Sequence, residues 1–218
     1  MSAGAPFPLR SELPGWELFW ARLELLPNDA KDRAEDRMAA LRREVSELAR
    51  ASLEGISLSA HETLAALRKL FRAAGTDPTR YRPSSEALLR RVLKGEDLPA
   101  IHPLVDLNNC LSVELAVPCC MMREESFGPP LVLRAGLPGE SYESLRGPFN
   151  LEGKPLLLDA EGPLDTPITG SVRVKVLPET RDVWLVAYLP EGVVTRERCA
   201  STLAELLAKA PVAKDLTP

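Results

Sequence analysis

The first 75 residues repeat apolar side chains at intervals of three and four, the spacing of one face of an α-helix. The pattern covers residues 15–26, 30–53 and 57–75. The first stretch holds two of the chain's three tryptophans and predicts a helix packed on the domain. The second is rich in strong helix formers, with Asn28 or Asp29 as its cap, and the third ends at Gly75. Residues 1–14 carry three prolines and predict an extended tail or a docked strand.

Residues 83–95 carry the best-marked helix of the chain. Pro83 suits a first turn, Ser84 or Ser85 suits the N-cap, and Gly95 suits the end. Apolar side chains fall on one face and basic side chains on the other, so we expect one face to pack and the other to meet solvent.

Beyond Pro118 the pattern becomes strand-like, with turns that contain glycine and proline. The predicted strands are residues 129–134, 155–159, 171–176 and 183–188. Residues 194–210 predict a closing helix. The sequence therefore predicts an α+β fold, with a mixed or mostly antiparallel sheet, flanking helices and a helical N-terminal extension. We expect residues 1–58 to be that tail and extension and residues 59–218 to be the main domain.

Composition adds few constraints. The chain has 218 residues, 45% of them apolar, and a net charge of −4, which gives no global electrostatic case for DNA or RNA. Four irregularly spaced cysteines, two of them adjacent, predict free thiols in a reducing compartment. No run approaches the ~20 apolar residues of a membrane span. We therefore expect a cytoplasmic protein.

Familiar catalytic and cofactor motifs are missing from the sequence. It has no glycine-rich phosphate loop and no Cys-x-x-Cys or His-Glu-x-x-His spacing, so we expect no metal and no cofactor. His102 and three cysteines leave a soft-metal site as a weak alternative. Cys119 and Cys120 are better interpreted as packed side chains, because no base is assignable to activate either thiol.

Positive charge is concentrated between residues 68 and 94 of this otherwise acidic chain. The cations are Arg68, Lys69, Arg72, Arg80, Arg82, Arg90, Arg91 and Lys94. Such a cluster suits contact with phosphate groups. It equally suits a solvated face, with Glu62, Asp77, Glu86, Glu96 and Asp97 as partners. The residues alone leave both interpretations open.

An unusual polar pair, Asp106 and Asn109, follows an apolar run from Ile101 to Val105. Leu98-Pro99 favours extended backbone before it. Such a pair commonly caps the next element or bonds local backbone.

Two segments carry a resemblance to a known family: RYRPSSEALLRRVLKGEDLP, from Arg80, and HPLVDLNNCLSVELAVP, ending at Pro118. They are similar to the tRNA-binding B3/B4 editing domain of the phenylalanyl-tRNA synthetase β subunit, and to free-standing proteins that consist of little else. The resemblance covers roughly residues 60–210.

The resemblance implies a pocket for the aminoacyl ester at the tRNA 3′ end. The implied catalytic residues are Asn109, Thr169, Gly170 and Ser171. The implied substrate-binding residues are Asp106, Ser112, Cys120 and Val172. The implied RNA-binding residues are Arg80, Arg82, Arg90, Arg91 and Lys94. Hydrolysis in such a pocket needs an ester and a water held in line, with donors for the oxyanion.

Two positions depart from the family pattern. Cys120 stands where the synthetase has a histidine, and Val172 stands where it has a glutamate that discriminates the tyrosine hydroxyl. Valine offers that hydroxyl no charged partner, so a smaller or more apolar aminoacyl group becomes the expectation.

The sequence and the resemblance therefore leave two candidate functions. The first is a hydrolase that removes a wrongly attached amino acid from tRNA in trans. The second is a non-catalytic RNA-binding or small-molecule-binding module that keeps the fold. Aminoacylation is excluded, because the catalytic and anticodon-reading parts of a synthetase have no counterpart in 218 residues. The tRNA, the amino acid and the oligomeric state stay open.

Overall fold

The computed structural model describes residues 6–27 and 31–217, with main chain only at 31–34. Its helices are α1 (Lys31–Ser52), α2 (Glu62–Ala74), α3 (Ser84–Leu93), α4 (Pro103–Leu115) and α5 (Arg196–Lys209), with a 3-10 turn at Glu124–Ser126. Its strands are β1 (Leu9–Ser11), β2 (Trp16–Leu25), β3 (Cys119–Arg123), β4 (Leu131–Ala135), β5 (Ser141–Ser144), β6 (Gly147–Asn150), β7 (Pro155–Asp159), β8 (Gly162–Asp165), β9 (Asp182–Pro190) and β10 (Ala213–Asp215).

The strands form two four-stranded sheets and a hairpin. One sheet has the order β1-β4-β7-β8, the other has the order β10-β2-β9-β3, and β5 pairs with β6. Only the β1–β4 pairing among these strands is parallel. The expected α+β fold with mixed, mostly antiparallel sheets is confirmed.

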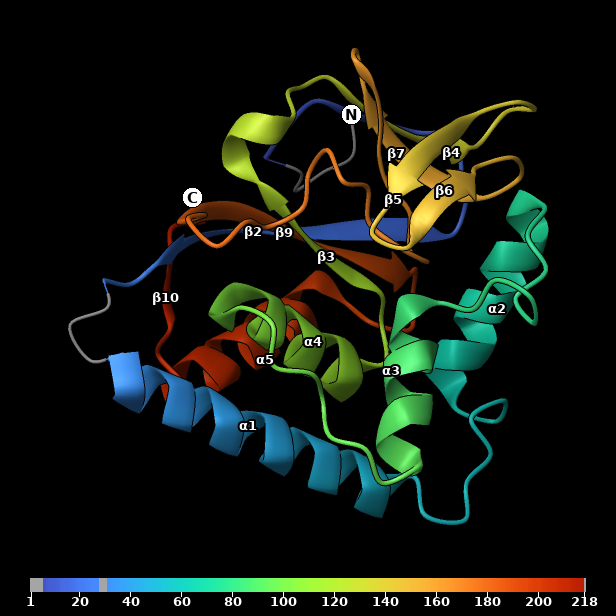
Figure 1. Cartoon of the computed structure of the whole chain (residues 1–218). Helices are drawn as coiled ribbons and strands as arrows, with labels where there is room; N and C mark the ends of the chain where they lie inside the picture. The colour runs from blue at the N-terminus through green and yellow to red at the C-terminus, as the bar shows by residue number, and fades with distance from the viewer. Residues whose placement is uncertain (1–5, 28–30, 218) are drawn as a thin grey trace.

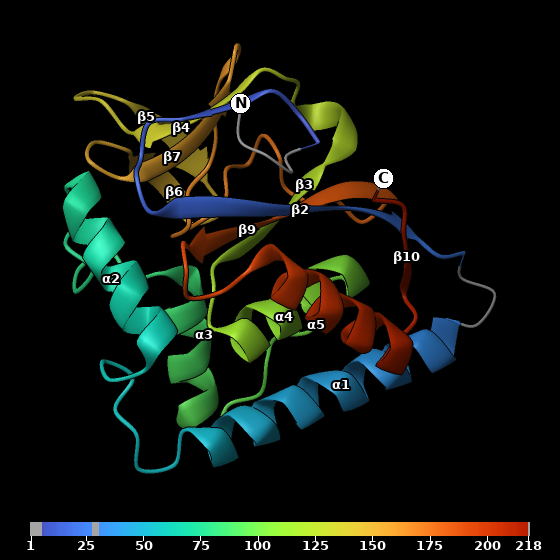
Figure 2. The same ribbon diagram turned by 180° about the vertical axis from the view of Figure 1, so that it is seen from behind.

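Helices cover one side of the sheet that holds β2 and β9. Figures 1 and 2 show α4 and α5 against this sheet and α1 beyond them, with the other sheet on the opposite side. Helices α2 and α3 stand at one end, where α2 contacts β9. The apolar core runs through these layers and includes Leu23, Phe71, Leu107 and Val186.

Residues 16–25 form strand β2, so the predicted helix there is wrong. β2 lies between β10 and β9 and pairs with β9 from Trp16 to Glu24. Most of its side chains are buried, because helices pack on one face and the second sheet covers the other. A strand buried on both faces loses the polar alternation by which strands are recognised. The proposed division after residue 58 stays a prediction, although β1 and β2 pair with strands from the second half of the chain.

The other predicted helices are present. α1 lies within the predicted 30–53, although its suggested caps, Asn28 and Asp29, fall outside the described residues. α2 begins at Glu62 with His61 as N-cap, later than predicted, and ends at Gly75 in left-handed conformation. α3 begins directly after Pro83 and α5 begins after Thr195.

Two further segments differ from the sequence prediction. Residues 103–115 form helix α4 after the extended backbone at 98–102, with Pro103 in its first turn. Residues 171–176 are not a strand: Ser171 makes one isolated bridge, and a turn follows. Arg173 instead forms ion pairs with Asp159 and Glu161, which fold this segment back toward β7 and β8. Within the described ranges, no helix combines the length and the apolar character of a membrane span.

Candidate functional site

Helix α4 carries the polar residues that the sequence singled out. His102 is its N-cap, and its Nδ1 accepts a hydrogen bond from the Leu104 N–H at 3.3 Å. Helices α1, α3 and α5 and strand β3 surround α4. Its polar side chains therefore lie inside the protein: Asp106, Asn108, Asn109 and Ser112 are all buried.

Asp106 is held by α1 and by the start of its own helix. Arg42 donates to its carboxylate in an ion pair, and the Ile101 N–H donates to it at 2.9 Å. No hydrogen bond of Asp106 joins it to residues 169–171 within the described chain. These contacts account for a buried carboxylate without any ligand, and its expected role toward a substrate stays a prediction.

The other polar residues of α4 differ in how their groups are satisfied. The Ser112 hydroxyl donates to the Val117 carbonyl at 2.7 Å, which closes the turn after the helix. Asn108 donates to the Cys119 carbonyl at 3.4 Å, while its own carbonyl oxygen is buried without a partner. Among the described residues Asn109 is 9% exposed and makes no side-chain hydrogen bond. Asn109 is therefore the amide of α4 with free donors.

A second segment, residues 165–171, follows strand β8 and is fixed by one threonine. The Thr166 hydroxyl donates to the Thr169 carbonyl at 3.0 Å and accepts from the Thr169 N–H at 3.2 Å. The Tyr142 hydroxyl, from the β5–β6 hairpin, donates to the same carbonyl. The Leu145 N–H donates to the Gly170 carbonyl at 3.2 Å. These bonds hold the loop against the hairpin.

Gly170 lies beside buried polar groups. A Cβ there would lie 3.5 Å from Asp165 Oδ1, 3.7 Å from Cys120 Sγ and 3.9 Å from Leu145 Cδ1. These are ordinary contacts, and the Gly170 backbone is not left-handed, so neither strain nor a clash demands glycine. The structure thus places Cys120 beside Gly170, while the roles expected of both residues stay predictions. Ser171 is buried with an unpartnered hydroxyl, while Val172 is 37% exposed.

Sequence reasoning missed the centre of this site, which is Asp165. The Tyr188 hydroxyl donates to Asp165 Oδ2 at 2.7 Å, and Oδ1 is buried without a partner of ordinary hydrogen-bond geometry. Burial raises the pKa of Asp165 to about 7, although the hydrogen bond from Tyr188 and the nearby Cys120 thiol oppose this. The signal in the sequence was Tyr188 itself, because a tyrosine inside an apolar strand requires a partner for its hydroxyl.

The thiols beside Asp165 are not activated. Burial, and then the charge of Asp165, raise the pKa of Cys120 well above its ordinary value. Burial does the same for Cys119. The two histidines are the N-caps of α2 and α4, at His61 and His102, and burial lowers the pKa of both. The site around Gly170 therefore offers a carboxyl group, hydroxyls and unactivated thiols, and no hydrogen bond among the described residues joins Asn109 to it.

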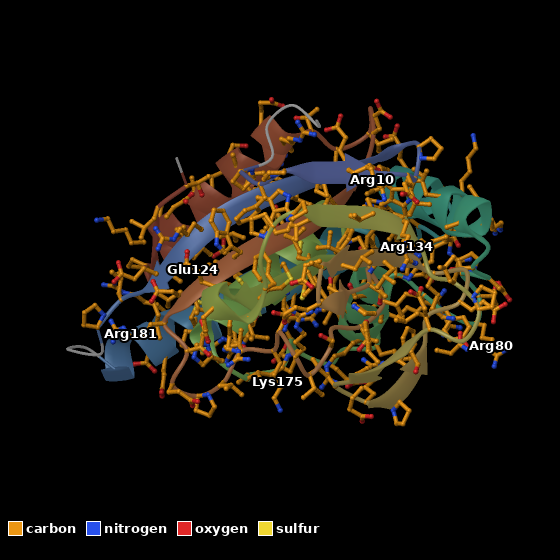
Figure 3. All side chains as sticks on the ribbon, turned by 90° about the horizontal axis from the view of Figure 1, so that it is seen from above. Arg10, Arg80, Glu124, Arg134, Lys175 and Arg181 are labelled. Carbon is orange, nitrogen blue, oxygen red and sulfur yellow. The ribbon has the colours of Figure 1, made fainter. Side chains whose placement is uncertain are left out.

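The basic segment is partly neutralised by acidic partners. Arg68 and Arg90 both bind Glu86, and Arg91 binds Glu96. Arg80 and Arg82 are exposed and make no ion pair among the described residues. Arg80 lies 5.1 Å from the ring centre of Tyr81, and Figure 3 shows it at the edge of the molecule.

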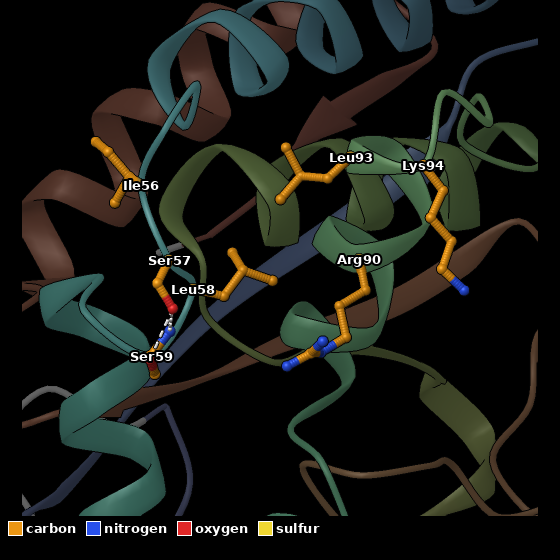
Figure 4. Close-up of a pocket in the computed structure, with 7 residues that line it drawn as sticks. All are labelled: Ile56, Ser57, Leu58, Ser59, Arg90, Leu93 and Lys94. Atoms are coloured by element: carbon orange, nitrogen blue, oxygen red, sulfur yellow. Dashed lines mark hydrogen bonds between the residues drawn. The ribbon is translucent and has the colours of Figure 1, made fainter.

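Both ends of α3 meet other parts of the protein. The Ser84 N–H, at its start, donates to the Pro167 carbonyl at 2.9 Å and so contacts the 165–171 segment. At its other end a hollow of about 320 Å³ lies between α3 and the connection from α1 to α2, as Figure 4 shows. Its lining is Ile56, Ser57, Leu58, Ser59, Arg90, Leu93 and Lys94. A helix of α3's length, roughly 15 Å, separates this hollow from the site at Gly170.

No group of three His, Cys, Asp or Glu side chains within 6–27 and 35–217 is arranged to hold a metal ion. What the geometry defines is an α+β domain with a buried polar site where its two sheets meet. Residues 66–205 match the B3/4 domain family, and the chain belongs to this family. The predicted resemblance to that domain of the phenylalanyl-tRNA synthetase β subunit is confirmed.

Among solved structures, the chain is similar to an N-terminal fragment of the phenylalanyl-tRNA synthetase β subunit from Pyrococcus horikoshii. The identity is 16%, the TM-score is 0.47, and the match covers 95% of this chain and 49% of that chain. This protein thus spans about half the length of that fragment. A comparison with curated proteins gives no match.

Proposed function

We propose that this protein binds the aminoacylated 3′ end of a tRNA and hydrolyses the ester of a misacylated tRNA in trans. Membership of the B3/4 domain family supports a function connected with tRNA. The observation that carries the proposal is the buried Asp165 carboxyl group beside Gly170 and Cys120, because one of its oxygens has no hydrogen-bond partner of ordinary geometry among the described residues.

The site suits a reaction that depends on orientation. The free Asn109 amide can donate to an ester oxygen as negative charge develops there, and such a donor is worth about 100-fold in rate in known oxyanion holes. The raised thiol pKa of Cys120 argues against a covalent intermediate, so a water molecule is the nucleophile. Val172 offers no charge to a side chain, which favours a small or apolar aminoacyl group.

The test is single-turnover deacylation of a panel of misacylated tRNAs by the parent protein. Gly170→Val should block the ester but leave tRNA affinity nearly intact, because its side chain fills the place beside Asp165. Gly170→Ala should lower the deacylation rate less, because its added Cβ would make only ordinary van der Waals contacts. Asn109→Ala should lower the rate tenfold or more. A parent inactive on every tRNA would exclude the hydrolase. Activity unchanged in both Gly170→Val and Asn109→Ala would put the site elsewhere.

One observation favours the second candidate, a binding module without chemistry. Both histidines serve as helix N-caps, so neither takes the place of the family histidine beside Gly170. A parent that binds aminoacyl-tRNA without hydrolysing it would establish this alternative.

A further inference from the structure

The buried carboxyl groups of the described residues differ in whether a cation neutralises them. They belong to Glu86, Asp106, Asp159 and Asp165. Three have arginine partners: Arg68 and Arg90 for Glu86, Arg42 for Asp106, and Arg173 for Asp159. No described cation forms an ion pair with Asp165. A buried carboxylate without a cation is costly, so a functional reason for it is expected.

The free oxygen of Asp165 faces the place over Gly170. Tyr188 occupies Oδ2, whereas Oδ1 has no partner of ordinary hydrogen-bond geometry, although the Cys120 thiol lies close to the carboxylate. An atom at the Cβ position of Gly170 would lie 3.5 Å from Oδ1, and its next neighbours are Cys120 and Leu145. Oδ1 itself is not accessible, whereas the neighbouring Leu145 side chain is 59% exposed, so an incoming group would reach Oδ1 by displacing Leu145.

We infer that Asp165 binds a primary ammonium group, and, on the basis of the proposed function, that this is the α-amino group of the aminoacyl ester. An ammonium is compact, carries three donors and supplies the charge that the other buried carboxylates receive from arginine. A hydroxyl group would leave the carboxylate charge uncompensated in the interior.

Among the titratable groups around Asp165, only Asp165 itself changes its protonation state near neutral pH. The titratable groups that face it are Tyr188 on β9, Cys119 and Cys120 on β3, and Tyr142 on β5. Burial raises the pKa of all four, so they stay protonated and neutral at pH 7. An ammonium ligand prefers the Asp165 carboxylate. Because an α-amino group loses its own proton at about pH 8, the affinity should rise with pH to a maximum between about pH 7 and 8 and then fall.

The experiment compares two non-hydrolysable probes: 3′-deoxy-3′-(L-alanylamido)adenosine, with a free α-amine, and its N-acetyl derivative. Calorimetric titration between pH 5.5 and 8.0 should show the parent binding the free amine tenfold or more tightly than the N-acetyl probe near pH 7.5, where carboxylate and ammonium coexist, and losing this advantage at pH 5.5. Asp165→Asn keeps the shape and should abolish both the preference and its pH dependence. Glu143→Gln, an exposed carboxyl on β5, is the matched control and should behave as the parent.

Tyr188→Phe gives a readout that a structural role would not produce. Loss of the hydrogen bond to Oδ2 should raise the pKa of Asp165 and move the midpoint of the amine preference to higher pH. Equal binding of the two probes by the parent, no binding of either, or a preference retained in Asp165→Asn would overturn the inference. Deacylation by a parent without the preference would leave the proposed function standing. The preference without deacylation would keep the ammonium site and reject the hydrolase.

Discussion

Arg68 on α2 and Glu86 on α3 form a two-pronged ion pair, with Nε to Oε2 at 2.8 Å and Nη2 to Oε1 at 2.9 Å. Burial acts to raise the pKa of Glu86, but the hydrogen bonds from Arg68 and Arg90 outweigh it and lower that pKa. The Glu86 side chain is 1% exposed, so the pair joins the two helices inside the protein. Part of the basic segment is therefore structural.

Arg68→Ala should destabilise the fold by about 3 kcal/mol, because it leaves the buried Glu86 carboxylate with Arg90 alone. Urea unfolding of the variant and the parent measures this difference. Lys69→Ala, on the exposed face of the same helix, is the control and should change stability by no more than ~0.5 kcal/mol. Equal losses in both variants would contradict the structural role of the pair.

Charge reversal at Arg80 and Arg82 should weaken tRNA binding more than reversal at Arg90 and Arg91. The first two arginines make no ion pair, whereas the second two already have acidic partners. Each lost phosphate contact should reduce the slope of log K against log salt by about 0.7 to 0.9. A salt titration of all four Arg→Glu variants measures this. Parent-like binding by all four would mean that tRNA contacts another face.

Cys120→Ser should retain most of the deacylase activity, because a thiol whose pKa is raised by burial and by Asp165 is not a nucleophile at neutral pH. Intact-mass analysis of the parent during turnover should find no aminoacyl adduct. A thioester on Cys120 would contradict this prediction.

Val172→Glu should shift preference toward an aminoacyl group with a hydroxyl-bearing side chain, since a carboxylate can bind that hydroxyl and valine cannot. Val172 is 37% exposed, so the substitution should not disturb the core. Deacylation of tyrosyl-tRNA and phenylalanyl-tRNA measures the shift. Val172→Gln tests whether charge is required, and an unchanged substrate ratio in both variants would place Val172 outside the pocket.

Asp165→Asn should make the protein more stable at pH 8 and remove a slope in its stability between about pH 4 and 7. The raised pKa means that the folded protein holds more protons than the unfolded chain in this window, so stability falls as pH rises. Urea unfolding at several pH values measures the slope, with Glu143→Gln as control. A variant less stable than the parent at pH 8 would show that the carboxylate is needed for folding.

Local signals in the sequence were sufficient for helices with clear ends, such as α3 between Pro83 and Gly95. They failed for β2, whose tryptophans at 16 and 20 fit helical spacing. Their rings lie in a strand because β9 supplies a partner along almost its whole length. That pairing joins residues more than 150 positions apart and leaves no local mark.

The candidate site was likewise predictable only in part from the sequence. The resemblance predicts Gly170 and Cys120 as site residues, and the structure places them side by side, while their roles stay predictions. Asp165 was missed because its meaning depends on Tyr188, which lies in another sheet. The role of Asp106 toward a substrate stays a prediction, and its burial is explained by Arg42, on a helix that no sequence pattern connects with it.

The pairing of β2 with β9 also affects how the chain must fold during synthesis. Residues 16–25 emerge from the ribosome first, whereas their partners at 182–190 emerge roughly ten seconds or more later at ordinary elongation rates. For that interval an apolar strand with two tryptophans has no neighbour on its β9 edge. Contacts so distant along the chain also close slowly. We therefore expect nascent protein to need protection from aggregation until β9 is complete.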